Sequence, residues 1–137
     1  MLDGLRVLDL TDERGLLCGR LLADLGADVV QVEPVAGSTA RLAPPLSGTT
    51  SLYWETYAAG KRGIAVDLDD SGEVAMLRSL ALAAHVVVTS WPRGRLAELG
   101  LDPATLRAAN PNLVYTVISP FGWSGPKADY ADCDLVV

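Results

Sequence analysis

The stretch RVLDLTDERGLLCGRLLADLGADVVQVEP, residues 6–34, contains a complete strand–helix–strand pattern. Residues 6–10 are rich in β-forming side chains, and residues 15–25 are apolar almost all round, as in a helix packed on a sheet. Gly26 follows as a residue that commonly ends a helix, and residues 27–34 form an apolar run typical of a buried strand. The stretch therefore predicts a βαβ unit.

The same alternation continues to the end of the chain. After an irregular excursion over residues 34–60, part of which (51–60) is expected to be helical, three further strands alternate with three helices. The strands are expected at 63–68, 85–92 and 112–119, and the helices at 69–84, 92–101 and 103–110. This order predicts an α/β fold, a Rossmann-like open, mainly parallel sheet with helices on both faces. The pattern does not specify the order of the strands.

Composition limits the class of protein. The chain has 137 residues, half of them hydrophobic and a fifth charged, which is typical of one globular domain. A net charge of -6 argues against nucleic acid as a partner, because phosphate binding needs a basic face. No apolar run approaches the roughly 20 residues that span a bilayer, and the start does not resemble a signal peptide. Two cysteines without metal-ligand spacing fit a reducing compartment, so we expect a cytoplasmic location, no membrane partner and no metal.

The turn after the first predicted strand lies where open α/β sheets bind ligands. Glu33, at the end of the second strand, imitates the acid that binds the ribose in dinucleotide folds. The glycine fingerprint of those folds is missing, since only Gly15 and Gly19 occur there. A tight contact between helix and sheet is therefore the preferred interpretation of these glycines.

Two short basic stretches are candidates for phosphate binding. Residues 60–63, GKRG, are interpreted either as a phosphate patch or as a solvated turn, and their position favours the turn. Residues 90–100, SWPRGRLAELG, follow a predicted strand. There Trp91 is suited to stack on a flat ring while Arg93 and Arg95 meet phosphates. Alternatively, Trp91 covers the edge of the sheet and both arginines face water.

The candidates for catalysis or metal binding are few. His85 is the only histidine and has no serine or cysteine nucleophile nearby, which makes it a poor triad member. Cys18 lies in the apolar helix and is expected in the core. Cys133 is flanked by two aspartates, which weaken a thiol as a nucleophile. Those aspartates and Asp129 have the chemistry to bind a cation, although an acidic loop is the preferred interpretation.

Several stretches, in order, resemble the family III CoA-transferases of the CaiB/BaiF, carnitine-dehydratase type. They are LDGLRVLDLT, CGRLLADLGADVVQVEP, GKRGIAVDL and LAELGLDPATLRAANPNLVYTVISPFGWSGPKADYADCDLVV. The resemblance implies a Rossmann-like N-terminal portion, a smaller second domain and a homodimer with interlocked subunits. It also implies the transfer of coenzyme A between an acyl-CoA and a carboxylic acid through an aspartyl–CoA thioester, with coenzyme A as substrate and carrier.

The resemblance also implies which residues contact coenzyme A. Trp91 stands where the family usually has an aromatic residue, on the adenine side. Glu98 replaces an arginine that the family often uses on the phosphates of CoA, and Arg93 or Arg95 is expected to compensate. The expected CoA-binding residues are Thr11, Asp12, Val66, Asp67, Leu68, Asp69, Ser90, Trp91, Pro92 and Arg93.

The family's nucleophilic aspartate falls beyond Asp134, past the last residue of this sequence. The resemblance therefore predicts no catalytic residue in this chain, which is expected to be the N-terminal portion of a larger enzyme. Residues 1–118 are the expected Rossmann-like CoA-binding portion, and residues 119–137 the connection and the start of a truncated helix.

Other functions are kept open. A non-catalytic module that binds CoA or a protein partner is one, and half of an assembly completed by another chain is a second. A relative of the 2-methylacyl-CoA racemases is a third, but Cys133 stands where that branch has its catalytic histidine, which argues against it.

Overall fold

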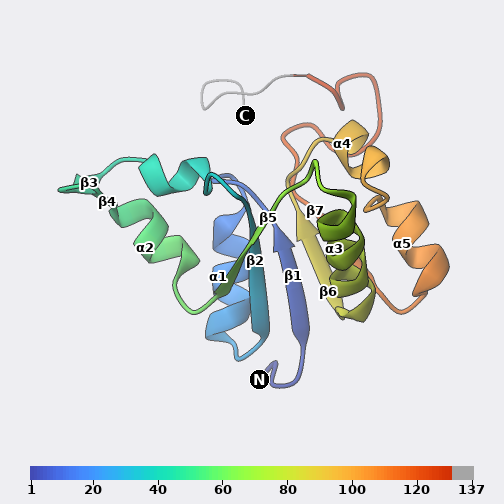
Figure 1. Cartoon of the computed structure of the whole chain (residues 1–137), viewed down its shortest axis with the longest axis horizontal. Coiled ribbons are helices and arrows are strands. Elements are labelled where there is room, and N and C mark those ends of the chain that lie inside the picture. Colours follow the sequence, from blue (N-terminus) through green and yellow to red (C-terminus); the bar gives the residue numbers. More distant parts are fainter. Residues whose placement is uncertain (131–137) are drawn as a thin grey trace.

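The computed structural model describes residues 1–130 and contains a five-stranded parallel sheet (Figure 1). Every neighbouring pair in the order β5-β2-β1-β6-β7 is parallel. The strands are β1 (Arg6–Leu10), β2 (Asp28–Pro34), β5 (Arg62–Val66), β6 (Val86–Thr89) and β7 (Val114–Val117). The predicted open parallel sheet is confirmed. The order of the strands, which the sequence did not specify, is that of a doubly wound fold.

Helices cover both faces of this sheet, as expected. Helix α1 (Leu16–Asp24) packs on the face that carries Val7 and Val29. Helices α3 (Ser71–Ala83), α4 (Arg93–Glu98) and α5 (Pro103–Ala109) pack on the other, which carries Leu8 and Leu10. Figure 1 shows α1 and α3 on opposite sides. Successive strand residues alternate between the two cores because side chains of a strand point to opposite faces.

The excursion between β2 and β5 contains short elements. These are η1 (Thr39–Leu42), the hairpin β3 (Leu46–Ser47) and β4 (Thr50–Ser51), and helix α2 (Leu52–Ala58). The expected helical part is confirmed. Arg41 fixes the excursion to the sheet, because its guanidinium pairs with both carboxylate oxygens of Glu33 and lies 4.1 Å from the ring centroid of Trp54. Glu33 is thus occupied by this pair, which does not fit the role of a ribose-binding acid.

The N-termini of helices α5 and α3 are both capped by an aspartate. Asp102 accepts hydrogen bonds from the N–H groups of Ala104 and Thr105 and so caps α5 at its N-terminus. Asp70 caps α3 in the same way, but Glu73 accepts the N–H of Asp67 instead of that of Asp70. Asp70 and Glu73 thus have the spacing of a capping box without its reciprocal hydrogen bond. None of the helices within residues 1–130 is long and apolar enough to cross a bilayer.

A buried charged cluster lies between α1 and the sheet. The Lys61 ammonium donates to Asp9 Oδ2 at 2.8 Å, Gln31 Oε1 at 2.9 Å and the Leu16 carbonyl at 2.8 Å. The side chains of Lys61 and Asp9 are 1% and 0% exposed. Both interpretations of residues 60–63 are therefore wrong for this lysine, which is neither a phosphate contact nor a solvated turn residue.

Gly19 makes room for this cluster. A Cβ atom at Gly19 would lie 1.9 Å from Asp9 Oδ2 and 2.9 Å from Lys61 Nζ, so any side chain there must push the charged pair apart. The expected tight contact of α1 with the sheet is thus confirmed at Gly19, and its physical reason is the close approach of a carboxylate.

We expect Gly19→Ala to lower the free energy of unfolding by about 1–3 kcal/mol, because the added methyl group overpacks a site that cannot relax without separating the ion pair. Urea unfolding followed by circular dichroism measures this. Gly94→Ala is the matched control, since it is also a helical glycine but has no atom within 4 Å of the added Cβ. An equal loss in both variants would contradict the steric explanation.

Candidate functional site

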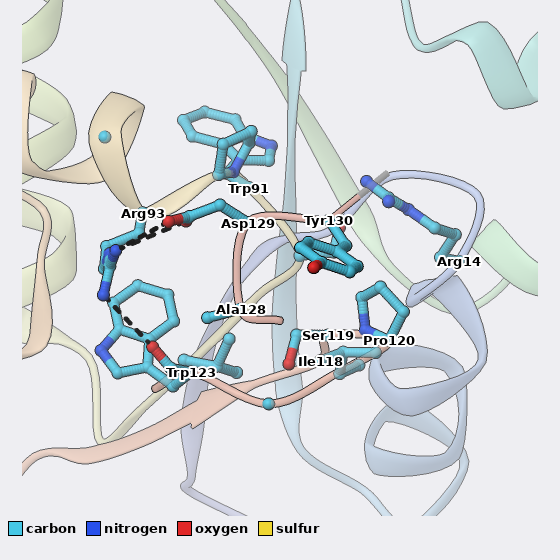
Figure 2. A pocket seen from close by; sticks show the side chains of 15 residues that line it. Arg14, Trp91, Arg93, Ile118, Ser119, Pro120, Trp123, Ala128, Asp129 and Tyr130 are labelled. Carbon is cyan, nitrogen blue, oxygen red and sulfur yellow. Dashed lines mark hydrogen bonds and ion pairs between the residues drawn. The ribbon is translucent and has the colours of Figure 1, made fainter. Parts of the chain in front are cut away.

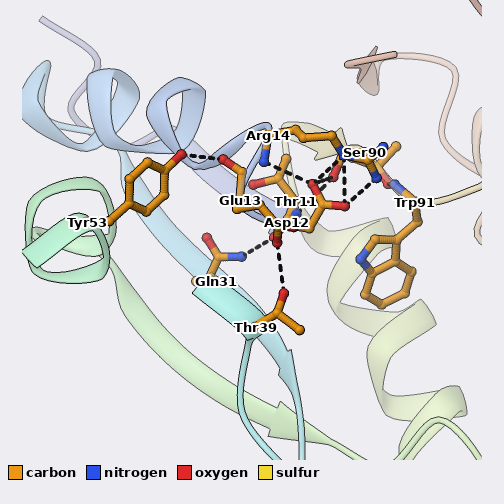
Figure 3. A network of polar contacts seen from close by, with 10 residues as sticks. Thr11, Asp12, Glu13, Arg14, Gln31, Thr39, Tyr53, Ser90 and Trp91 are labelled. Carbon is orange, nitrogen blue, oxygen red and sulfur yellow. Dashed lines mark hydrogen bonds and ion pairs between the residues drawn. The ribbon is translucent and has the colours of Figure 1, made fainter. Parts of the chain in front are cut away.

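The carboxyl ends of β1 and β6 form the central edge of the candidate site. These two strands are neighbours, and the chain order reverses between them, which makes this the switch point where open α/β sheets bind ligands. The turns that follow the strands are joined by a pair of hydrogen bonds (Figure 3). Ser90 Oγ donates to Asp12 Oδ1 at 2.8 Å and accepts the Asp12 N–H at 2.9 Å.

Two further contacts fix the turn after β1, one from Asp9 of β1 and one from Tyr53 of α2 in the excursion. Asp9 Oδ1 accepts the N–H and the hydroxyl of Thr11, at 3.0 and 2.6 Å. On the other side, the Tyr53 hydroxyl donates to the Glu13 carbonyl at 2.6 Å (Figure 3). Because Thr11 is buried and its hydroxyl is used by Asp9, its contribution to the site is to shape the turn.

The Asp12 carboxylate is held in its ionised form. Partial burial by itself would raise its pKa, but hydrogen bonds from Arg14 and Ser90 and the charge of Arg14 outweigh burial and lower the pKa below its ordinary value of 3.8. The Arg14 guanidinium contacts both carboxylate oxygens. At neutral pH this corner of the site therefore carries a fixed arginine–aspartate pair.

A cavity of about 340 Å³ opens beside the Asp12–Ser90 contact (Figure 2). The strand ends supply one part of its wall and the connecting segment, residues 119–130, supplies the other. In Figure 1 this segment passes over the carboxyl edge of the sheet. The lining residues are Arg14, residues 90–94, 117–120, 122–123 and 128–130.

Aromatic and cationic side chains face each other across the cavity. Figure 2 shows Arg14 and Arg93 on opposite sides, with Trp91 and Tyr130 between them and Trp123 on the side of Arg93. The Arg93 guanidinium lies 3.1 Å from Asp129 Oδ2. Flat rings beside guanidinium groups are suited to a ligand that carries both an aromatic ring and phosphate groups.

The structure divides the expected CoA-binding residues into two groups. Four of them, Ser90, Trp91, Pro92 and Arg93, line the cavity. Asp12 is hydrogen-bonded to Ser90 of its lining, and Thr11 precedes Asp12 in the same turn.

Residues 66–69 lie at the carboxyl end of β5, at the far edge of the sheet, and do not line the cavity. In this second group Val66 is buried, so its side chain is not available to a ligand, whereas Asp67, Leu68 and Asp69 lie in the turn that leads into α3. Asp69 is 95% exposed, and its carboxylate lies 3.9 Å from Arg95 of α4. A CoA-binding role for either group stays a prediction.

The sequence pointed to the turn that contains Arg14 but not to Arg14 itself, and in the connecting segment it pointed only to Asp129, as a candidate ligand of a cation. The segment is dense in Pro and Gly, and this signal was interpreted only as a link between domains. Its position over the cavity follows from β7, which pairs beside β6 and so delivers residues 118–120 to the same edge. Knowledge of the strand order would have placed it there.

The remaining candidates lie away from the cavity. His85 precedes β6, at the opposite end of the strands, where its Nδ1 accepts the Arg6 N–H at 3.0 Å. Cys18 is partly buried against the sheet, and burial and the nearby Asp9 raise the pKa of its thiol. Cys133 and the aspartates beside it lie outside the described residues. Within residues 1–130, no group of three or more His, Cys, Asp or Glu residues could hold a metal ion.

Comparison with known proteins identifies the family. A family model described as CoA-transferase family III matches residues 2–137. The chain belongs to this family. Its relatives include the succinate–glutarate CoA-transferase of Agrobacterium fabrum, which is 39% identical over 99% of this chain. The human succinyl-CoA:glutarate CoA-transferase is 35% identical over 98% of the chain.

Solved structures share the fold of this family III chain. A CaiB/BaiF family protein from Brucella suis superposes with a TM-score of 0.90 at 35% identity and covers 98% of the chain. A protein from Mycobacterium tuberculosis gives 0.86 at 38% identity over 97%. The chain spans 36% of the Agrobacterium relative and 37% of the Brucella structure, about a third of each.

We expect Ser90→Ala to lower the free energy of unfolding by about 1–2 kcal/mol at neutral pH, because it leaves the Asp12 N–H without its acceptor and removes one bond to the carboxylate. The loss of that bond also moves the pKa of Asp12 up toward 3.8.

The pH dependence follows from the direction of this shift. A lowered pKa in the folded state gives stability that is present above the unfolded value and is lost as the pH falls through the folded value. The difference between wild type and Ser90→Ala should therefore shrink below about pH 4. Unfolding at several pH values measures it, with Ser79→Ala on the exposed side of α3 as the control. A difference that stays constant with pH would contradict the role of Asp12.

Proposed function

We propose that this chain is the CoA-binding, N-terminal part of an acyl-CoA:carboxylate CoA-transferase. The observation that carries the proposal is the cavity at the switch point, where Trp91 and Arg93 stand beside the Asp12–Ser90 contact. Family membership supports it, as do the activities of the relatives, which transfer CoA between succinate and glutarate or from acetyl-CoA to oxalate. A short dicarboxylic acid is accordingly the class of acceptor that we propose.

The dimensions of the cavity fit one part of coenzyme A. Its volume of about 340 Å³ lies at the lower end of the range for ligand pockets, about 300–1,000 Å³, and CoA is larger than most ligands of such pockets. In the proposal, Trp91 stacks on a ring of the ligand and Arg93 meets a phosphate group. The turn at residues 67–69 contacts another part of the same ligand.

The chemistry of transfer needs a nucleophile that we place outside the described residues. A carboxylate attacks the acyl-CoA carbonyl and expels the CoA thiolate, which leaves a mixed anhydride. The thiolate then attacks the enzyme-side carbonyl of this anhydride, so the enzyme–CoA thioester forms and the donor acid leaves as a carboxylate. The acceptor carboxylate takes CoA through the same two steps in reverse and regenerates the enzyme carboxylate. The residues of this chain bind and orient CoA. Asp12 is already bonded to Arg14 and Ser90, which does not suit it to act as the attacking group.

Assembly and location belong to the same proposal. Helix α1 exposes Leu17 and Leu21, which are 50% and 54% exposed and lie one turn apart. An apolar stripe of this kind is consistent with association of subunits. We propose a homodimer in the cytoplasm, with acyl-CoA and a carboxylic acid as its small-molecule partners.

Calorimetric titration with CoA tests the binding site. We expect Trp91→Ala to weaken binding about tenfold, since stacking of a base on an aromatic side chain is worth about 1–3 kcal/mol. Trp54→Ala is the matched control, because Trp54 lies in α2 beneath Arg41 and does not line the cavity. Equal weakening by both variants would show a loss of folding instead of a lost contact.

The proposed absence of a nucleophile is tested by turnover. Incubated with succinyl-CoA and glutarate, this chain should form glutaryl-CoA no faster than a blank, because covalent transfer requires the missing carboxylate. Mass spectrometry of the thioesters measures the exchange. Exchange well above the blank that Asp12→Asn abolishes would overturn the assignment and make Asp12 the nucleophile.

A further inference from the structure

The guanidinium of Arg93 is already occupied by the connecting segment. Its Nη2 atom lies 3.1 Å from Asp129 Oδ2 and 3.4 Å from Asp129 Oδ1, and its Nη1 atom lies 3.5 Å from the Trp123 carbonyl oxygen (Figure 2). Arg93 is also the cation expected to meet a phosphate of the ligand. Asp129 and any anion that enters the cavity therefore compete for the same N–H donors of Arg93.

Asp129 is placed for this contact by the shape of the segment. The Ala128 and Tyr130 N–H groups donate to the carbonyls of Gly125 and Lys127, which forms two successive turns around Asp129. The ring of Tyr130 then meets Phe121 edge-on, with 6.3 Å between the centroids. These local contacts fold the segment back on itself and hold the carboxylate toward Arg93.

The pair is weak enough for a ligand to displace. The side chains of Arg93 and Asp129 are 49% and 76% exposed, and exposed pairs of this kind change an equilibrium by about fivefold or less. A phosphate group carries more negative charge than one carboxylate and offers three acceptor oxygens to the planar fork of an arginine. It therefore competes successfully for the same donors.

We propose that Asp129 is a built-in competitor for the phosphate of the ligand at Arg93. The pair lowers the affinity of the cavity for phosphate-bearing ligands, and binding of such a ligand releases the connecting segment from α4. That the ligand is CoA rests on the proposed function, whereas the competition itself concerns any phosphate group that reaches Arg93.

Titration with inorganic pyrophosphate measures the competition directly. We expect Asp129→Asn to bind it about two- to fivefold more tightly than wild type, and Arg93→Gln about tenfold more weakly. Opposite effects from the two halves of one ion pair distinguish competition from a structural role, because loss of structure would weaken binding in both variants.

A double variant separates direct competition from the general effect of charge. If Asp129 acts through Arg93, then Asp129→Asn has no effect in the Arg93→Gln background, whereas a long-range field would persist there. Asp28→Asn is the matched control, since it breaks an exposed aspartate–arginine pair at the opposite end of the sheet and should leave pyrophosphate binding unchanged.

Each outcome decides the proposal. The proposal is overturned if Asp129→Asn binds pyrophosphate as tightly as wild type or more weakly. It is also overturned if Asp129→Asn still tightens binding in the Arg93→Gln background, or if pyrophosphate binds to none of the variants. A parallel titration with CoA keeps the two proposals apart. If pyrophosphate binding follows the expected pattern but CoA does not bind, Asp129 is a competitor and the proposed function is wrong. If CoA binds and Asp129→Asn has no effect, the proposed function stands and the competition is wrong.

Discussion

The buried ammonium of Lys61 is the interaction on which the site depends. It joins Asp9 of β1, Gln31 of β2 and the Leu16 carbonyl of α1, with side chains almost fully excluded from water. An ion pair in such a place is stable only when each charge finds further hydrogen bonds, and here each does. Among the described residues, no buried side-chain nitrogen or oxygen lacks a partner. The cluster therefore sets the distance between α1 and the sheet.

A chain of hydrogen bonds connects this buried cluster to the turns at the surface of the site. Asp9 uses its second oxygen to fix Thr11, which shapes the turn after β1. That turn presents Asp12 to Ser90 across the boundary between β1 and β6. A rigid interior thus positions a polar edge, in agreement with the general rule that parallel sheets bind ligands at the ends of their strands.

The other wall of the cavity has a different character. It comes from the connecting segment, which is held by short turns, one aromatic contact and the exposed pair between Arg93 and Asp129. Contacts of this kind are individually weak, so this wall is the one that a ligand can move. A site with one fixed and one displaceable wall suits the proposed binding and release of CoA.

The sequence by itself determined the elements and the fold class, because apolar periodicity and helix caps such as Asp102 are local signals. It also pointed to Ser90, Trp91 and Arg93, which do line the cavity. Only the tertiary structure decided the strand order, the burial of Lys61 and the meeting of Arg93 with Asp129. Lys61 stands in a stretch typical of a solvated turn, and Asp129 lies 36 residues from Arg93 along the chain. Pairing between strands and desolvation of a charge depend on residues far apart in sequence, so they cannot be predicted from a local sequence pattern.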